Sequence, residues 1–153
     1  MDTQLENEAQ LHRKYAVDLF NFTWELLEKP DRTVEEDDSM LHAAHASRYH
    51  WGMVGEAVNL ARGEWQLSRV YVTLGRAEPA LHHARRCLAY CESNPDALQD
   101  WDLPYAHEAL ARSHALAGEA DEAGRHAAAA RELTARVADA EDREHLEADL
   151  ATL

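Results

Sequence analysis

The sequence has few of the residues that interrupt helices and few of those that build strands. Its 153 residues include only six glycines and four prolines, and valine and isoleucine are scarce whereas alanine is abundant. This composition favours helices over strands. A chain of this length can bury about 70% of its unfolded surface in one domain. We therefore expect a single all-helical domain.

Long apolar runs and a cysteine framework are also missing. No stretch approaches the roughly 18 apolar residues that suggest a membrane-crossing helix, and the first residues are too polar for a secretory signal. We therefore expect no membrane insertion. The only cysteines, Cys87 and Cys91, stand one helical turn apart, where a bridge would fit disulfide geometry poorly. Buried, reduced thiols in a cytoplasmic protein are the expectation.

Basic residues are too few to balance the acidic ones. Lys and Arg together number 15 against 29 Asp and Glu, which gives a formal net charge of −14. Nucleic-acid phosphates are bound through Lys and Arg that displace counterions, so we expect no nucleic-acid partner. The acidity is concentrated in residues 1–38 and 139–153. Such blocks form either solvated faces or docking surfaces for a basic partner.

A pattern with a period of 43 residues organises the centre of the chain. The stretch from Gly63 to Glu92 predicts two helices that fold back on each other at Gly75, and a second copy follows it. The matched positions are Leu67 with Leu110, Tyr71 with His114, Gly75 with Gly118, Ala80 with Ala123, Ala84 with Ala127, and Cys87 with Ala130. A fixed period of this kind is the sequence signature of stacked helix pairs.

These copies resemble the tetratricopeptide repeat (TPR), in which a glycine sits at the turn and small residues on the second helix permit close packing. The resemblance covers residues 61–94 and 104–135. It implies an all-α, TPR-like antiparallel helix-hairpin array, that is, a short right-handed α-solenoid. The period is longer than the TPR period of about 34 residues, and we place the extra residues in a linker between the repeats. Arginine far outnumbers lysine, which is typical of GC-rich coding DNA and, with the repeat type, suggests a bacterial origin.

About seven helices are expected in four parts. These are an N-terminal pair in residues 1–55, repeats in residues 56–94 and 102–137, and a capping helix in residues 138–153. Roughly three repeats are needed to bury the faces of a solenoid, so the N-terminal pair or a second chain must supply the missing layer.

Local signals place several helix ends, and the tryptophans outside the repeats suggest self-association. The first helix should stop at Pro30, Thr33 and Glu36 form a candidate capping box, and Asp102 is predicted to cap the fifth helix. We also expect a homodimer, because the two ends of a short array are apolar. The residues that could close these ends, within the chain or across a twofold axis, are Trp24, Trp51 and Trp101.

The TPR resemblance implies a concave groove lined by the first helix of each pair. The positions that would face it are Arg62, Trp65, Arg69, Thr73, Tyr105, Glu108, Arg112 and Leu116. Arginine can grip a carboxylate with two hydrogen bonds, and large aromatic rings beside it are typical of binding hot spots. We therefore predict a non-catalytic scaffold for a protein or peptide partner that carries an acidic residue or a free C-terminus. The other interpretation is that Trp65 belongs to the core and that the arginines pair with nearby acids.

A second hypothesis is a small metal- or ligand-binding helical protein. Asp38, His42 and His45 share one face of the second predicted helix, and imidazoles with a carboxylate suit zinc or another divalent ion. The alternative is that these histidines form hydrogen bonds at a helix contact or face the solvent. No serine or cysteine stands in a nucleophile motif, and no glycine-rich phosphate loop is present. We therefore expect neither catalysis nor a cofactor.

Overall fold

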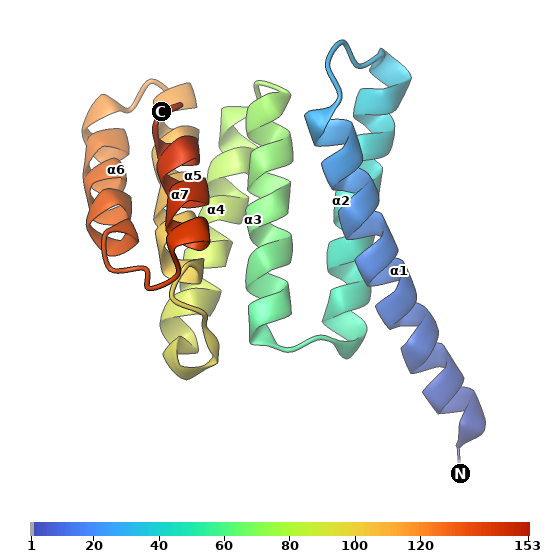
Figure 1. The fold of residues 1–153 in the computed structure, drawn as a ribbon. Helices are drawn as coiled ribbons and strands as arrows, with labels where there is room; N and C mark the ends of the chain where they lie inside the picture. Colours follow the sequence, from blue (N-terminus) through green and yellow to red (C-terminus); the bar gives the residue numbers. More distant parts are fainter. Residues whose placement is uncertain (1) are drawn as a thin grey trace.

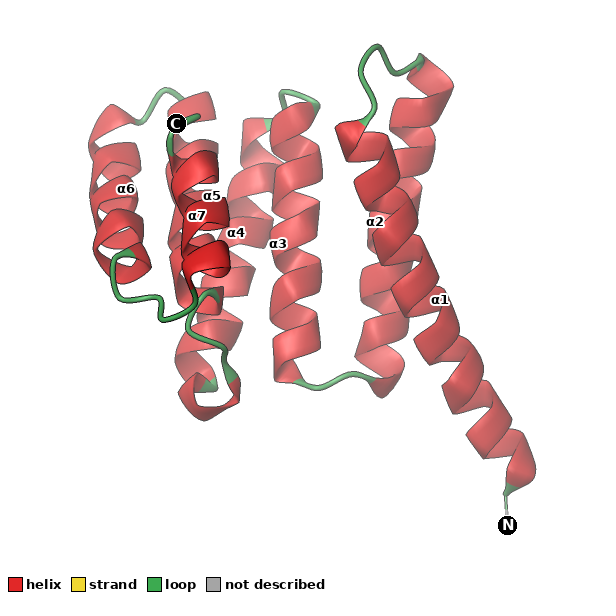
Figure 2. Ribbon diagram, in the orientation of Figure 1, coloured by secondary structure: helices red, strands yellow, loops and turns green. Residues whose placement is uncertain are grey.

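The computed structural model describes residues 2–153, and every regular element among them is helical (Figure 2). In chain order, the elements are α1 (Thr3–Glu28), α2 (Val34–Val54), α3 (Ala57–Thr73), α4 (Ala77–Ser93), a 3₁₀ turn η1 (Pro95–Ala97), α5 (Asp102–Leu116), α6 (Ala120–Thr134) and α7 (Ala140–Leu150). The prediction of an all-α chain is confirmed. No helix within residues 2–153 combines the length and the apolar character that crossing a membrane requires.

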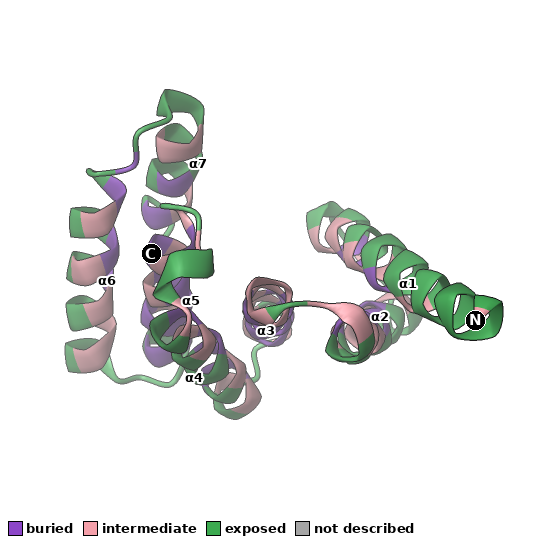
Figure 3. Ribbon diagram, turned by 90° about the horizontal axis from the view of Figure 1, so that it is seen from below, coloured by how far each residue is buried: buried purple, intermediate pink, exposed green. Residues whose placement is uncertain are grey.

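Consecutive helices fold back on each other as antiparallel pairs (Figure 1). The pairs are α1 with α2, α3 with α4, and α5 with α6, and α7 then packs against α6 and α5. Contacts from α1 to α3 and from α3 to α5 align the first helices of the three pairs in one layer. Figure 3 shows α1 at one end of the array and α7 beside α5 and α6 at the other. The N-terminal pair α1–α2 thus provides the third helix pair that the two repeats lack.

The turns within the two repeats are built alike. Gly75 and Gly118 have φ angles of 74° and 80°, in the left-handed region that glycine adopts at helix ends without steric cost. In both turns, the residue after the glycine donates its backbone N–H to a carbonyl five residues earlier. The distances are 2.9 Å from Arg76 to Tyr71 and 2.9 Å from Glu119 to His114. The predicted period therefore extends to backbone hydrogen bonds.

Small side chains lie where helices approach each other closely. Ala80 and Ala84 are fully buried, and Ala127 is 8% exposed. The buried Ser68 hydroxyl donates to the Ala80 carbonyl at 2.9 Å and lies 3.1 Å from the Ser113 hydroxyl, which links α3 to α4 and to α5. These small residues let the helices of the two repeats approach each other closely.

Two local predictions had different outcomes. The capping box is confirmed, because the Thr33 side chain accepts from the Glu36 backbone and the Glu36 side chain accepts from the Thr33 backbone. The assignment of Asp102 as the cap of the fifth helix is wrong, since Asp102 is already the first residue of α5. Its buried carboxylate instead accepts hydrogen bonds from the Gln99 backbone and from Arg62.

Candidate functional site

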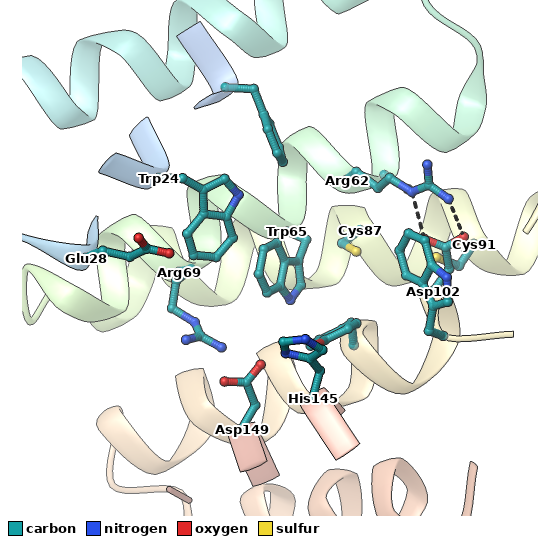
Figure 4. Close-up of a pocket in the computed structure, with 14 residues that line it drawn as sticks. Trp24, Glu28, Arg62, Trp65, Arg69, Cys87, Cys91, Asp102, His145 and Asp149 are labelled. Carbon is teal, nitrogen blue, oxygen red and sulfur yellow. Dashed lines mark hydrogen bonds and ion pairs between the residues drawn. The ribbon is translucent and has the colours of Figure 1, made fainter. Parts of the chain in front are cut away.

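A groove of about 500 Å³ lies between the layer of first helices and α7 (Figure 4). Its aromatic lining comes from α1, from α3 and from the start of α5, and consists of Phe20, Trp24, Trp65, Trp101 and Tyr105. The rest of its lining consists of the charged or imidazole side chains Glu28, Arg62, Arg69, Asp102, His145 and Asp149, together with Ala61, Cys87 and Cys91. The groove therefore combines a large apolar surface with a few polar groups, which is the usual composition of a ligand site.

The aromatic rings form a continuous row across three helices. Trp24 lies 5.4 Å from Trp65, and Trp65 lies 5.4 Å from Tyr105, measured between ring centroids. Phe20 extends the row on α1 at 6.5 Å from Trp24, and Trp101 extends it beside α5 at 6.4 Å from Tyr105. Tilted and edge-to-face pairs at these distances are the favoured geometries for aromatic side chains. The row holds its rings in place before any ligand binds.

Arg62 is fixed at one end of the groove. Its Nε and Nη2 atoms donate to the two carboxylate oxygens of Asp102, each at 3.0 Å (Figure 4). Its guanidinium also lies 4.3 Å from the centroid of the Trp101 ring, close enough for a cation–π contact. Both the charge and the planar face of Arg62 are thus used within the chain.

Arg69 belongs to a second ion network, centred on a buried carboxylate. Glu108 has no exposed surface, and its Oε1 atom accepts from Arg69 at 3.0 Å and from Arg112 at 2.7 Å. Arg112 also donates to the Asp149 carbonyl at 3.0 Å and to the Thr152 hydroxyl at 2.7 Å. The network joins α3, α5 and the C-terminal end of α7.

The eight predicted groove residues divide into three sets. Four of them line the groove, namely Arg62, Trp65, Arg69 and Tyr105. Glu108 and Arg112 form the adjoining ion network, whereas Thr73 and Leu116 are exposed and lie outside the lining. Trp65 also packs against two clusters of buried residues. The arginines pair with acids inside the chain, as the second interpretation of these positions held.

Sequence reasoning missed the lining that comes from outside the repeats. Phe20, Trp24 and Glu28 come from α1, and His145 and Asp149 come from α7. The repeat period does not extend to α1, and nothing in the sequence places α7 beside the groove. Trp24 and Trp101 line the groove, and Trp51 is 9% exposed. These tryptophans therefore have contacts within the chain, and the homodimer stays a prediction.

Two carboxylates of the groove lining, Glu28 and Asp149, are not part of the ion networks. Neither Glu28 nor the side chain of Asp149 has an ion pair within 4.0 Å among the described residues, and Figure 4 shows them on either side of Arg69. Burial first, then the charge of Asp149 and a hydrogen bond from the Tyr105 hydroxyl to its carboxylate, raise the pKa of Tyr105, so its hydroxyl stays protonated. With Arg62 and Arg69 already paired, the groove presents carboxylates that can accept from a ligand.

The predicted histidine face on α2 does not form a metal-ligand geometry. Asp38 and His42 are exposed, and His45 directs Nε2 to the Tyr71 hydroxyl at 2.8 Å. Within residues 2–153, a group of His, Cys, Asp or Glu with converging ligand atoms occurs elsewhere and contains none of these three. His45 thus lies at a helix contact and His42 faces the solvent, as the alternative interpretation of this face described.

Comparisons of the chain with protein-family models, with curated proteins and with solved structures gave no match.

Proposed function

We propose that the chain is a non-catalytic, TPR-like scaffold that binds a peptide segment of a partner protein in the aromatic groove. The observation that carries this proposal is the row of five rings across α1, α3 and the start of α5, beside a concavity of about 500 Å³. Pockets of this size hold one or a few side chains, and Trp, Tyr and Arg are the residues that most often dominate binding energy.

The geometry favours a basic peptide over the acidic one that the sequence suggested. A ligand carboxylate would have to compete for Arg62 or Arg69 with Asp102 or Glu108, which are 5% and 0% exposed. Drawing Arg62 away would leave the buried Asp102 carboxylate without its cation, which costs about 3–5 kcal/mol, and drawing Arg69 away would leave Glu108 with Arg112 alone. Glu28 and Asp149, in contrast, have no competing cation to release. The proposed ligand therefore carries an aromatic or large apolar side chain and, close to it, a Lys or Arg.

The net charge supports the same partner. At −14, the chain attracts basic segments over longer distances, which raises association rates at low salt. The paired arginines contribute in another way, because they hold the neighbouring rings and carboxylates in fixed positions. A groove that is already ordered loses less conformational entropy when it binds.

A peptide display selection on the immobilised full chain tests the proposal. We expect enrichment of sequences with an aromatic residue near Lys or Arg, and binding of a selected peptide is then measured by fluorescence anisotropy. Replacing Glu28→Gln and Asp149→Asn together should weaken binding roughly tenfold or more, because interfacial charge pairs contribute at least about 1.5 kcal/mol. The matched control replaces the exposed Glu25→Gln and Glu144→Gln, which lie on the same two helices outside the groove lining.

The aromatic contribution has its own pair of variants. Trp24→Leu shortens the row of rings and should reduce binding, whereas Phe22→Leu removes a ring that is 40% exposed outside the groove lining and should not. Selection that enriches no aromatic or basic motif, or binding that is equal in the groove variants and their controls, would refute the proposed function.

A further inference from the structure

The first repeat contains a pair of stacked rings between its two helices. The rings of Tyr71 on α3 and His83 on α4 lie 5.6 Å apart at an interplanar angle of 1°. Nδ1 of His83 is 2.6 Å from Oε2 of Glu64, whose other oxygen lies 3.3 Å from Arg48. The histidine in this stack is held by a carboxylate, and the carboxylate by an arginine.

The second repeat contains the same stack with different chemistry. Forty-three residues later, the rings of His114 on α5 and His126 on α6 lie 5.6 Å apart at an angle of 3°. Nδ1 of His107, at the position of Glu64, is 3.0 Å from Nδ1 of His126. Glu122 stands where the first repeat has Pro79. In the second repeat, His114 thus stands in the place of Tyr71, His107 in that of Glu64, and Glu122 in that of Pro79.

These replacements bring together three side chains that can ligate a metal. The ligand atoms of His114, Glu122 and His126 all lie within 4.8 Å of one another. Glu122 and His126 are four residues apart on one face of α6, and the turn at Gly118 brings them opposite His114 in the last turn of α5. We propose that His114, Glu122 and His126 form a site for one divalent transition-metal ion of the zinc type.

The ligand set fits an ion of this class. Two imidazoles and one carboxylate suit zinc and neighbouring divalent ions, and a three-ligand site leaves a position for water. Zinc bonds of about 2.0–2.2 Å place tetrahedral ligand atoms about 3.4 Å apart, so the side chains need to close by roughly 1 Å or a little more. Glu122 and His126 are half-buried on α6, and Glu122 would exchange a solvent-exposed ion pair with Arg125 for the metal.

Both imidazoles also have the outer partners that metal-binding histidines need. Nδ1 of His126 is within hydrogen-bonding distance of Nδ1 of His107, at 3.0 Å, and Nδ1 of His114 lies 3.4 Å from Oε1 of Glu119. A partner on one ring nitrogen fixes the tautomer and leaves the other nitrogen for the metal. His107 and Glu119 are positioning residues in this arrangement, not ligands.

The first repeat shows that the ring stack alone does not require a metal. Its stack has nearly the same separation and angle, yet Tyr71 offers a phenol and Pro79 offers no ligand. Packing between the helices therefore explains the stack in both repeats, but not the convergence of ligand atoms in the second. The proposed site is confined to the second repeat and does not depend on the groove.

The test uses the full chain, stripped with a chelator and dialysed against Zn²⁺, with bound metal counted by elemental analysis. We expect one ion per chain, and at least a tenfold loss of affinity in Glu122→Gln and in His126→Gln. The control is His42→Gln, which removes an exposed histidine of the α2 face. Circular dichroism checks that each variant keeps its helices.

Imidazole NMR of the unsubstituted chain gives a second readout that needs no variant. Addition of Zn²⁺ should shift the ring nitrogens of His114 and His126 and leave those of His42 in place. The proposal is overturned by a chain that takes up no stoichiometric zinc, by binding that survives both substitutions, by binding lost in His42→Gln, or by shifts confined to other histidines.

Discussion

Removing both arginines from the Glu108 network should strongly destabilise the chain. In Arg69→Met with Arg112→Met, the fully buried Glu108 carboxylate keeps neither cation, and its Oε2 atom already has no hydrogen-bond partner. Breaking a buried ion pair from one side costs about 3–5 kcal/mol. A domain is stable by only about 5–15 kcal/mol, so this loss is a large part of the total.

Urea unfolding followed by far-UV circular dichroism measures this loss. With an m value of about 2 kcal/mol/M, a loss of about 4 kcal/mol lowers the midpoint by about 2 M. The control, Arg125→Met with Arg136→Met, removes two arginines whose side chains are each 69% exposed and paired within α6 or beside its end. Exposed pairs contribute about 0–1 kcal/mol each, so the control midpoint should move little.

Removing the carboxylate together with the arginines separates the destabilisation caused by an unpaired buried charge from that caused by lost packing. Adding Glu108→Leu to Arg69→Met and Arg112→Met leaves no buried charge, and apolar replacements of buried ion networks are often neutral or stabilising. We expect the triple variant to recover most of the lost midpoint. The reasoning fails if the arginine pair behaves like the exposed control, or if the triple variant is no more stable than the double variant.

Two further predictions concern backbone strain and pH. Gly124→Ala should stabilise α6 by about 0.5–1 kcal/mol, because its added Cβ meets no atom within 4 Å, whereas Gly118→Ala should destabilise, because φ there is +80°. Equal melting temperatures for the two variants would contradict this. Burial alone would raise the pKa of Glu64, but the hydrogen bond and charge of His83, with Arg48, lower it below its ordinary value of 4.5. A carboxyl with a lowered folded-state pKa stabilises the chain above its unfolded pKa and loses that contribution as the pH falls through its folded pKa. The free energy of unfolding should therefore fall on acidification below pH 4.5, and less steeply in Glu64→Gln; parallel acid profiles would show that the pair contributes nothing.

The helices could be predicted from the sequence because their signals are local. Glycine at 75 and 118 marks the two turns through the left-handed conformation, and Thr33 with Glu36 marks the start of α2. Asp102 misled the prediction because an aspartate before an apolar run is typical of a cap. Its actual role depends on Arg62, 40 residues away, and sequence spacing carries no signal for such a contact.

The groove was only partly predictable for the same reason. The TPR resemblance placed Trp65 and Tyr105 in one groove, but it could not show that Trp24 from α1 would continue the row of rings. Spacing on one helix also drew attention to the histidines of α2, whereas the converging histidines lie on two helices joined by a turn. His107 and His114 are seven residues apart, and with Glu122 and His126 across the turn they could have been recognised in the second repeat.

The contacts of Arg112 indicate what α7 does in the array. Arg69 of the first repeat reaches forward to Glu108, on the first helix of the next pair. Arg112, 43 residues later, reaches forward to the Asp149 carbonyl and the Thr152 hydroxyl, at the end of α7. The residue 43 positions after Glu108 is Ala151, which offers no carboxylate. The last carbonyls of a helix carry partial negative charge and favour a cation, so they take the place of the missing side chain. By this argument, α7 occupies the place of the first helix of a further pair. The contacts between successive repeats therefore extend to α7, although the sequence of α7 no longer follows the 43-residue period.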